Sequence, residues 1–293
     1  MRELAGRVAV VTGGAGGIGR AMGERFAREG MKVVLADVES EALNAAADEM
    51  RTSGMDVTGV VCDVADYGSV EALRDAALGR HGAVHLLCNN AGIGAGAEGA
   101  LWEHELNDWR WAFNVNVYGI IHGINAFVPA MVAGGDEGHI VNTSSGNGGV
   151  SPLRSTPQYA VTKAAVVTLT ECLYAQLQDV GSRIGASVLF PGPHMLRTGI
   201  FSSWRVRPPA LAKKRPRRTP YPTIEDIEAQ MSAAGIAVNY TEPAEVADQV
   251  VTAVRAGDFW ILAPSPATDL QIQARAASML ERSNPTYLRE VPG

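Results

Sequence analysis

Cysteine is scarce in this sequence. Its 293 residues include only Cys62, Cys88 and Cys172, an odd number of thiols that are far apart and form no CxxC or cysteine–histidine spacing. A disulfide framework needs paired cysteines, and a zinc site needs closely spaced ligands. We therefore expect neither, predict no metal site, and interpret the three thiols as buried side chains of a protein in a reducing compartment.

Basic charge is also in short supply. Charged residues make up 19% of the chain, hydrophobic residues make up 46%, and the formal net charge is −6. Nucleic acids and anionic membranes attract basic surfaces, so neither is expected as a partner. The apolar fraction is too high for a disordered chain and is enough for one large core. We expect a single domain over residues 1–293.

Long apolar runs are absent as well. No stretch reaches the roughly 18 consecutive apolar residues of a membrane-spanning helix, and the opening MRELAGRVAVVTGG lacks the apolar core and cleavage site of a secretory signal. Internal repeats and low-complexity segments are also missing. The expectation is a soluble, cytoplasmic protein.

The chain does contain a regular alternation of β-branched runs and amphipathic stretches, which is typical of βα units that form a parallel sheet. The expected strands are residues 8–12, 32–36, 56–61, 84–88, 139–143, 185–190 and 259–263. The expected helices are residues 17–29, 40–53, 69–81, 106–133, 157–180 and 243–256. The prediction is an α/β fold: a Rossmann-type, doubly wound, seven-stranded parallel sheet with helices on both faces.

Two segments depart from this alternation. Residues 193–241 show no strand period and are interpreted as an insertion that covers the site, a substrate lid. Residues 265–293 are expected to form a helical tail, with a helix at about 269–282. The tail follows the last predicted strand, so we expect it to lie outside the sheet.

A glycine-rich turn follows the first strand in the sequence VAVVTGGAGGIG. Without Cβ atoms, Gly13, Gly17 and Gly19 allow the backbone to turn tightly and to approach a pyrophosphate. The helix that begins beside Ile18 directs free N–H groups and a positive dipole end at that anion. This context predicts a dinucleotide site.

The TGxxxGxG spacing is similar to that of the short-chain dehydrogenase/reductase family, in its NAD-preferring subgroup. Asp37 ends the second strand, where a carboxylate can accept hydrogen bonds from the adenosine ribose and would repel a 2′-phosphate. No Arg or Lys stands at residues 14–16. NAD is therefore the expected cofactor, and the alternative interpretation of Asp37 is a solvated turn residue.

The resemblance extends to further cofactor contacts. It implies contacts from Asp63 and Val64 after the third strand, from Asn90, Ala91 and Gly92 of the sequence NNAG, and from Pro191 and Gly192 beside the nicotinamide. The polar members could equally be helix caps or turn formers. Thr198 lies six residues after Gly192, where the family usually has a threonine at four, and His194 of this loop is either a substrate contact or simply solvated.

Tyr159 and Lys163 are spaced i, i+4 on an expected helix, so their side chains share one face. Free tyrosine, with a pKa of about 10, is a poor base at neutral pH. A neighbouring ammonium and a positive nicotinamide would stabilise the phenolate and lower that pKa. The pair is therefore a candidate for proton transfer.

The family pattern supplies two more catalytic candidates. Ser145 corresponds to its substrate-binding serine, although the interval to Tyr159 is one residue longer than usual, which leaves Ser144 as the alternative. Asn116 corresponds to its catalytic asparagine, which holds a water between itself and the lysine, and the NxxG spacing selects it over Asn114.

Together these residues imply an NAD-dependent oxidoreductase that interconverts a secondary alcohol and a ketone. Ser145 and Tyr159 would bind the substrate oxygen, and Tyr159 would exchange its proton. Lys163 would bind the nicotinamide ribose, and hydride would move directly between substrate carbon and nicotinamide. The alternatives are an NADPH-dependent 3-ketoacyl or other ketone reductase, which Asp37 disfavours, and a non-catalytic NAD-binding regulatory protein, which would not need four catalytic residues.

The lid carries the remaining signals. Its apolar residues favour an apolar or aryl substrate, with packing onto the body as the alternative: Met195, Leu196, Ile200, Phe201 and Trp204. Its basic residues are interpreted as a solvated, mobile run, with binding of an anionic substrate group as the alternative: Arg205, Arg207, Lys213, Lys214, Arg215, Arg217 and Arg218. The helices at 106–133 and 157–180 resemble those through which family members pair, so a homotetramer or homodimer is expected.

Overall fold

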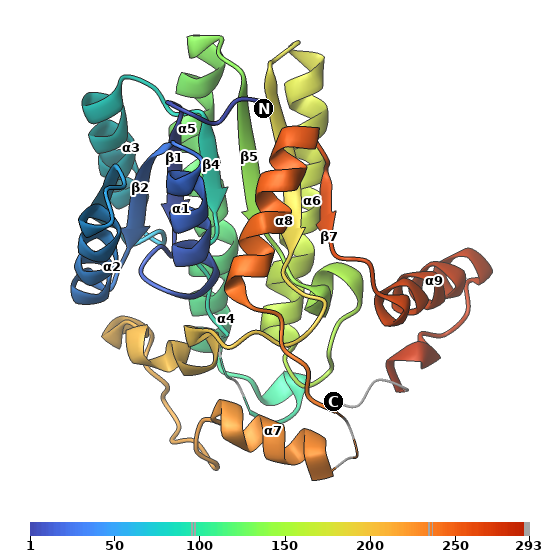
Figure 1. The fold of residues 1–293 in the computed structure, drawn as a ribbon. Coiled ribbons are helices and arrows are strands. Elements are labelled where there is room, and N and C mark those ends of the chain that lie inside the picture. Colours follow the sequence, from blue (N-terminus) through green and yellow to red (C-terminus); the bar gives the residue numbers. More distant parts are fainter. Residues whose placement is uncertain (95, 97, 234, 236, 290–293) are drawn as a thin grey trace.

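A single parallel sheet forms the centre of the protein (Figure 1). The computed structural model describes residues 1–94, 96, 98–233, 235 and 237–289. The strand order across the sheet is β3-β2-β1-β4-β5-β6-β7. The strands are β1 (Val8–Thr12), β2 (Lys32–Asp37), β3 (Val57–Val61), β4 (Leu86–Asn89), β5 (Gly138–Thr143), β6 (Ile184–Phe190) and β7 (Trp260–Leu262). The predicted doubly wound sheet is confirmed, and each strand boundary lies within two residues of its predicted position.

Helices cover both faces of this sheet (Figure 1). They are α1 (Gly17–Arg28), α2 (Ser40–Thr52), α3 (Tyr67–His81), α4 (Leu106–Phe113), α5 (Gly119–Gly134), α6 (Pro157–Asp179), α7 (Ile224–Ala233), α8 (Pro243–Ala256) and α9 (Pro266–Glu281). A π-helical segment, Asn114–Tyr118, joins α4 to α5, so the expected helix at 106–133 is continuous but changes its hydrogen-bond pattern.

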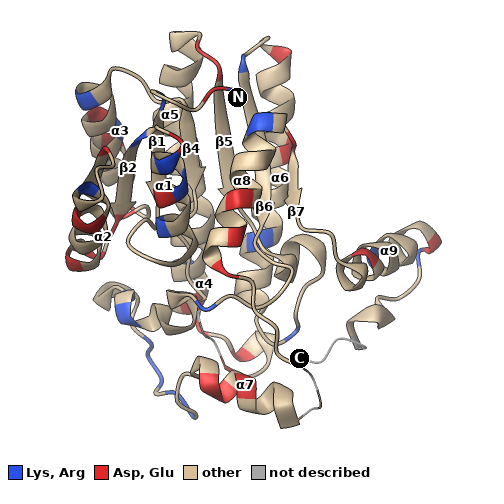
Figure 2. Cartoon of the chain, in the orientation of Figure 1, with Lys and Arg blue, Asp and Glu red and all other residues tan. Residues whose placement is uncertain are grey.

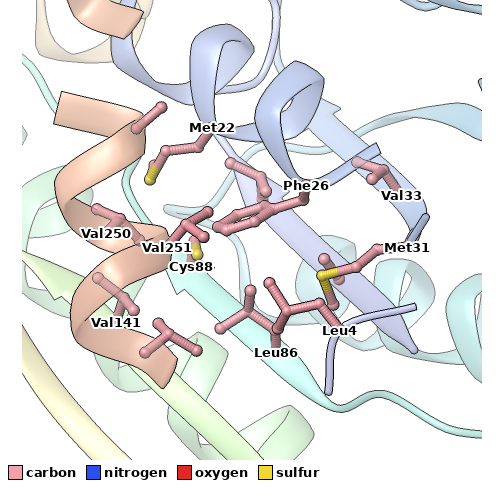
Figure 3. Close-up of a cluster of buried hydrophobic side chains, with 14 of the residues drawn as sticks. Leu4, Met22, Phe26, Met31, Val33, Leu86, Cys88, Val141, Val250 and Val251 are labelled. Carbon is pink, nitrogen blue, oxygen red and sulfur yellow. The ribbon is translucent and has the colours of Figure 1, made fainter. Parts of the chain in front are cut away.

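The core divides into two apolar layers, one on each face of the sheet. Successive residues of β1 alternate between them: Ala9 and Val11 pack with α1, α2 and α8, whereas Val8 and Val10 pack with α3, α5 and α6. Figure 3 shows the first layer, where Phe26 of α1 lies between the sheet and α8. Since side chains of a strand point alternately to opposite faces, a continuous apolar strand can serve both layers.

The strand order reverses at β1, whose neighbours are β2 on one side and β4 on the other. Crossovers leave the carboxyl ends of these strands in opposite directions, which opens a crevice between the loops that follow them. The glycine-rich turn and Asn90 follow strands at this edge, and Asp37 is the last residue of one. The fold therefore brings the predicted cofactor residues to one place.

One helical run, Leu106–Gly134, is long and apolar enough to cross a membrane by length and composition, with a mean hydropathy of 1.4 and 39% of the window buried. It packs as a core helix does. Ala126 and Phe127 of α5 belong to the buried layer that contains β4 and α3. The apolar character of this run is explained by its place against the sheet.

Residues 193–241 are called the lid below. Hydrogen bonds join the first residues of the lid to its last residue. The backbone N–H of Thr241 donates to the carbonyl of Met195 at 3.0 Å, and the Thr241 hydroxyl accepts from the N–H of His194 at 3.1 Å. The lid contains α7 and a 3₁₀-helical segment, Gly199–Val206, neither of which was among the helices expected from the sequence.

Two further sequence expectations need correction. Cys62 and Cys88 are buried, but Cys172 is exposed on α6, where its side chain points away from the core. The tail helix α9 begins three residues earlier than expected and has no buried residue in its 16 positions. In Figure 1 it projects from the body beyond β7.

Candidate active site

The glycine-rich turn has the backbone shape that its sequence predicts. Gly17 has φ +52°, in the left-handed region that glycine favours. A Cβ atom at Gly19 would lie 2.0 Å from the carbonyl oxygen of Gly13, so only glycine allows α1 to approach the end of β1 this closely. The half-buried side chain of Ile18 packs against the core layer of α1, which leaves its backbone as the part facing the turn.

The N-terminus of α1 fits an anionic ligand. No side chain caps the helix at Gly16, and no acidic residue stands in its first turn. Its free N–H groups and the helix dipole therefore suit a pyrophosphate. Thr198 lies over this turn, since its methyl carbon would be 3.2 Å from a Cβ at Gly17. The longer spacing from Gly192 thus still brings Thr198 to the cofactor turn.

Asp37 lies against the same turn. One carboxylate oxygen accepts from the backbone N–H of Ala15 at 3.0 Å, and the other accepts from the N–H of Glu39 at 3.1 Å. Each oxygen retains a lone pair. The carboxylate is therefore fixed at the end of β2 and can still accept hydrogen bonds from ribose hydroxyls.

The loop after β4 is anchored to β1 by a residue that the sequence analysis did not single out. The hydroxyl of Thr12 accepts from the N–H groups of Asn90 at 2.9 Å and Ala91 at 3.1 Å, while the Asn90 amide donates to the Thr12 carbonyl at 3.0 Å. Gly92 follows, where a Cβ atom would lie 3.4 Å from both Asn116 Oδ1 and Lys163 Nζ. This loop joins the cofactor side of the site to the catalytic side.

Asn116 is fully buried in the π-helical segment. Its side-chain oxygen accepts from the N–H of Ile93 at 2.8 Å, and its amide donates to the Ile93 carbonyl and to the Thr162 hydroxyl, both at 3.0 Å. Asn114 is only partly buried. Asn116 therefore links the loop after β4 to α6, next to Lys163.

Lys163 is 2% exposed, and its ammonium donates to the carbonyl oxygen of Thr143 at 2.9 Å. Burial penalises the charged form and lowers the pKa of Lys163 to about 8. Its Nζ atom lies 5.5 Å from the centre of the Tyr159 ring. The i, i+4 spacing thus places the two side chains together on α6.

The structure distinguishes the two candidate serines. Ser144 is buried and donates its hydroxyl to the backbone carbonyl of Lys163 at 2.7 Å. Ser145 instead hydrogen-bonds Tyr159 and accepts from the N–H of Asn147 at 3.2 Å. The hydroxyl beside the tyrosine is therefore that of Ser145.

The expected lowering of the tyrosine pKa is not found in the protein alone. Burial raises the pKa of Tyr159 above its ordinary value, and the hydrogen bond from Ser145 only partly opposes this effect. The ammonium of Lys163 donates to a backbone carbonyl and lies 5.5 Å from the centre of the phenol ring. The protein by itself holds Tyr159 as a neutral phenol.

The tail contributes a contact that the sequence did not indicate. Arg275 of α9 donates to the carbonyls of Gly148 at 3.4 Å and Val150 at 2.8 Å, in the turn after Ser145. An isolated arginine in a tail helix carries no signal for such a contact. It fixes one edge of the active-site loop from outside the sheet.

The remaining cofactor candidates occupy less specific environments. Asp63 is exposed, and its carboxylate accepts from the N–H of Ala65 at 2.9 Å, a contact that a turn former also makes. Val64 is buried against Gly119 of α5. Pro191 and Gly192 follow β6 at the same edge of the sheet, and the side chain of His194 is exposed.

The basic run of the lid is not a freely solvated segment. Asp108 is 1% exposed and pairs with Arg207 at 2.7 Å and Lys213 at 2.9 Å. Elsewhere Arg205 pairs with Glu39, Arg215 with Glu105 and Arg217 with Glu98. In Figure 2 the basic residues form a blue stretch that leads toward α7. Because acidic side chains of the same chain neutralise most of them, the run fastens the lid to the body, and the expectation of a mobile solvated run is wrong.

The apolar lid residues divide between the two expected roles. Leu196 packs against the core layer of α1, whereas Trp204 is half-exposed and stacks on Tyr221 with ring centres 5.6 Å apart. The guanidinium carbon of Arg217 lies over the Tyr221 ring, 4.0 Å from its centre. Part of the lid therefore packs on the body, and part presents an aromatic surface.

Comparisons with known proteins agree with this geometry. Residues 7–206 match the family model described as short chain dehydrogenase. The crystal structure of a short-chain dehydrogenase/reductase from Burkholderia phymatum in complex with NAD has a TM-score of 0.87 and 41% identity, and the match covers 98% of each chain.

Two curated relatives also carry dehydrogenase names. The 1-deoxy-11-beta-hydroxypentalenate dehydrogenase of Streptomyces avermitilis is 38% identical over 184 residues, which are 63% of this chain and 67% of that protein. The C alpha-dehydrogenase of a Sphingobium species is 31% identical over 265 residues, covering 89% of this chain and 82% of that protein.

Proposed function

The chain belongs to the short-chain dehydrogenase family, and from that premise we propose that it transfers hydride between NAD and the carbon of a secondary alcohol or ketone. The observation that carries the proposal is the grouping of Ser145, Tyr159 and Lys163 beside Asn116, at the sheet edge where the glycine-rich turn lies. A protein that only binds a nucleotide has no need for this acid/base set.

Tyr159 is proposed to move the proton at the substrate oxygen. In the direction of ketone reduction its phenol donates that proton, and the neutral state favoured by burial suits this step. In the direction of alcohol oxidation a phenolate must accept the proton. The oxidised nicotinamide brings a positive charge to the site, which favours the phenolate.

Ser145 and Lys163 are proposed to act on either side of that tyrosine. The Ser145 hydroxyl, already hydrogen-bonded to Tyr159, can donate to the same substrate oxygen and orient it. The Lys163 ammonium has further donors beyond the one it gives to Thr143 and can bind a ribose hydroxyl. Asn116 is proposed to position the loop after β4 and, through a water, the lysine.

NAD is the proposed cofactor because Asp37 is held at the end of β2 with its carboxylate against the turn. A 2′-phosphate would meet that negative charge. The related Burkholderia structure contains NAD. The residues proposed to hold the cofactor are those predicted from the sequence: Gly13, Gly17, Ile18, Gly19, Asp37, Asp63, Val64, Asn90, Ala91, Gly92, Tyr159, Lys163, Pro191 and Gly192.

An apolar or aryl secondary alcohol is the proposed substrate class. The half-exposed ring of Trp204 supports it, because a flat aromatic surface suits an apolar partner. Pairing of the lid cations with acidic side chains argues against an anionic group as the main recognition element.

The test is a calorimetric titration of the wild type and of Tyr159→Phe with NAD, NADH, NADP and NADPH, followed by turnover of apolar secondary alcohols. We expect both proteins to prefer NAD(H) and the variant to lose about a hundredfold or more in turnover, since general acid–base catalysis contributes about 10²–10⁴-fold. Preference for NADP(H) would contradict the role of Asp37. Wild-type turnover by the variant would show that the proton comes from another group.

A further inference from the structure

The first part of the lid, residues 198–206, crosses the crevice at the carboxyl edge of the sheet and is called the strap below. One end lies over the glycine-rich turn, where Thr198 contacts Gly17. Near its middle, the Ser203 hydroxyl accepts from the N–H of Gly94 at 3.1 Å, in the loop after β4. Ser203 is buried, so this contact is a packed one.

The third contact of the strap is an ion pair at the end of β2. Arg205 donates through Nε to one oxygen of Glu39 at 2.9 Å and through Nη2 to the other at 2.5 Å. Such a two-point arginine–carboxylate pair is directional as well as charged. Glu39 is two residues after Asp37 and donates its own N–H to that carboxylate.

Arg205 also organises the strap itself. Its Nη1 group donates to the carbonyls of Gly199 and Ser202 and to the Ser202 hydroxyl, each at 3.0 Å. The guanidinium therefore holds the 3₁₀-helical segment with one nitrogen and Glu39 with the other two. Loss of the glutamate charge would remove this anchor of the strap without removing the contacts inside it.

These anchors coincide with the successive parts of the proposed cofactor site. The end of β2 is the proposed adenosine ribose position, the N-terminus of α1 is the pyrophosphate position, and the loop after β4 leads to the catalytic residues. The other lid cations with ion-pair partners, among the residues that the structure describes, pair with acidic residues of the segment 98–108 or of α7. Arg205 is the lid cation that reaches the adenosine end.

We propose that the Arg205–Glu39 ion pair is a latch that holds the strap across the dinucleotide crevice and so slows dissociation of the bound cofactor. The inference rests on the proposed cofactor site and adds a positioning role for two residues outside it. Because the strap lies over the turn that binds the pyrophosphate, the cofactor leaves only when the strap lifts, and lifting it separates Arg205 from Glu39.

The test measures the rate of NADH dissociation by stopped-flow fluorescence, with excess NAD as the competitor. Arg205 and Glu39 are 38% and 33% exposed, so we expect the Glu39→Gln variant to release NADH about two- to fivefold faster at low salt, as fits a partly solvated pair. Raising NaCl from about 0.05 M to about 0.5 M should speed release from the wild type and leave the variant nearly unchanged.

Two controls separate the latch from a general loss of structure. Arg215→Gln removes a lid cation that pairs with Glu105 away from the crevice, and it should leave the dissociation rate unchanged. In an Arg205→Gln background, adding Glu39→Gln should have no further effect, because a double-mutant cycle isolates the pair. The melting temperatures of all variants should agree closely with that of the wild type.

The outcomes distinguish the latch from the function on which it rests. If the wild type binds NADH but Glu39→Gln releases it at the wild-type rate at low salt, the latch is wrong and the proposed function stands. If Arg215→Gln speeds release as much as Glu39→Gln, the effect comes from loosening any ion pair of the lid, and the latch is again wrong. If the wild type binds no dinucleotide, both proposals fail.

Discussion

The sheet body and the lid are stabilised by different forces. In the body, both faces of the sheet bury continuous apolar layers, with side chains such as Phe26 and Phe127 at or below 1% exposure. In the described part of the lid, the buried residues are Ser203 and Thr241, and both are polar. The lid is fastened instead by ion pairs to Glu39, Glu98, Glu105 and Asp108.

Because of this difference, the forces that keep the body folded are not the ones that keep the lid closed. Apolar burial contributes about 25 cal/mol per Å² and does not depend on salt at moderate concentrations, so it suits the part that must not move. Partly exposed ion pairs contribute less than about 1 kcal/mol each and are screened by salt. The part of the lid that the half-exposed Arg205–Glu39 pair holds can therefore open at small cost while the sheet beneath it stays folded.

The largest expected effect is in the body. Phe26→Ala should lower the free energy of unfolding by about 4 kcal/mol, because a large fully buried side chain leaves a cavity. The measurement is urea denaturation. Phe201→Ala in the lid is the matched control and should cost less than about 1 kcal/mol, since Phe201 is only partly buried. Equal losses from the two variants would remove the distinction between the regions.

Lys163, the proposed catalytic lysine, is an exception inside the body, because its buried ammonium should lower the free energy of unfolding at neutral pH. Its pKa is lowered from 10.5 to about 8, so below about pH 8 the folded state carries a buried charge at a cost of about 3 kcal/mol. Between about pH 8 and pH 10.5 the unfolded chain binds more protons than the folded one, and stability therefore rises with pH.

Lys163→Met tests this sign. The variant should be more stable than the wild type at pH 7, by up to about 3 kcal/mol less the lost hydrogen bond to Thr143, and it should be inactive. Denaturation at several pH values from 7 to about 10.5 should show the difference shrinking as the pH rises. A difference that stays constant with pH would mean that Lys163 is not buried as a charge.

The smallest effect of the three should be local to the lid. Asp108→Asn keeps the side-chain size but removes the charge that Arg207 and Lys213 share, which should cost about 2 kcal/mol. Hydrogen exchange should increase in lid peptides and stay unchanged in the peptides of β1 and α1. Asp48→Asn, at an exposed pair with Arg51, is the control and should change neither. Faster exchange throughout the sheet would show that the two regions unfold together.

The two regions also differed in how far their structure could be predicted. The strands and helices of the body were placed closely, because period 2 and period 3.6 are local patterns that buried apolar layers impose on the sequence. Local patterns also predicted that Tyr159 and Lys163 share one face of a helix and that Asp37 lies at the end of a strand. Helix α7 was not predicted, and α9 was placed three residues late at its start; neither helix has a buried residue to impose a strong apolar pattern.

The lid ion pairs could not be predicted because they join residues that are far apart in the sequence. Glu39 and Arg205 are separated by 166 positions, and nothing local in either segment marks the other. A basic run in isolation is indistinguishable from a solvated one. The same holds for Thr12, whose hydroxyl orders the loop after β4, and for Arg275, which reaches that site from α9.

The sequence by itself determined the fold class and the approximate position of each strand, since these follow from local periodicity, and its motifs supplied the proposed catalytic set through their resemblance to a family. Tertiary structure alone decided which serine faces Tyr159, the direction of the shifts in the pKa values of Tyr159 and Lys163, and the fastening of the lid. Those properties depend on burial and on charges brought together from distant segments, and neither is encoded in the spacing of neighbouring residues.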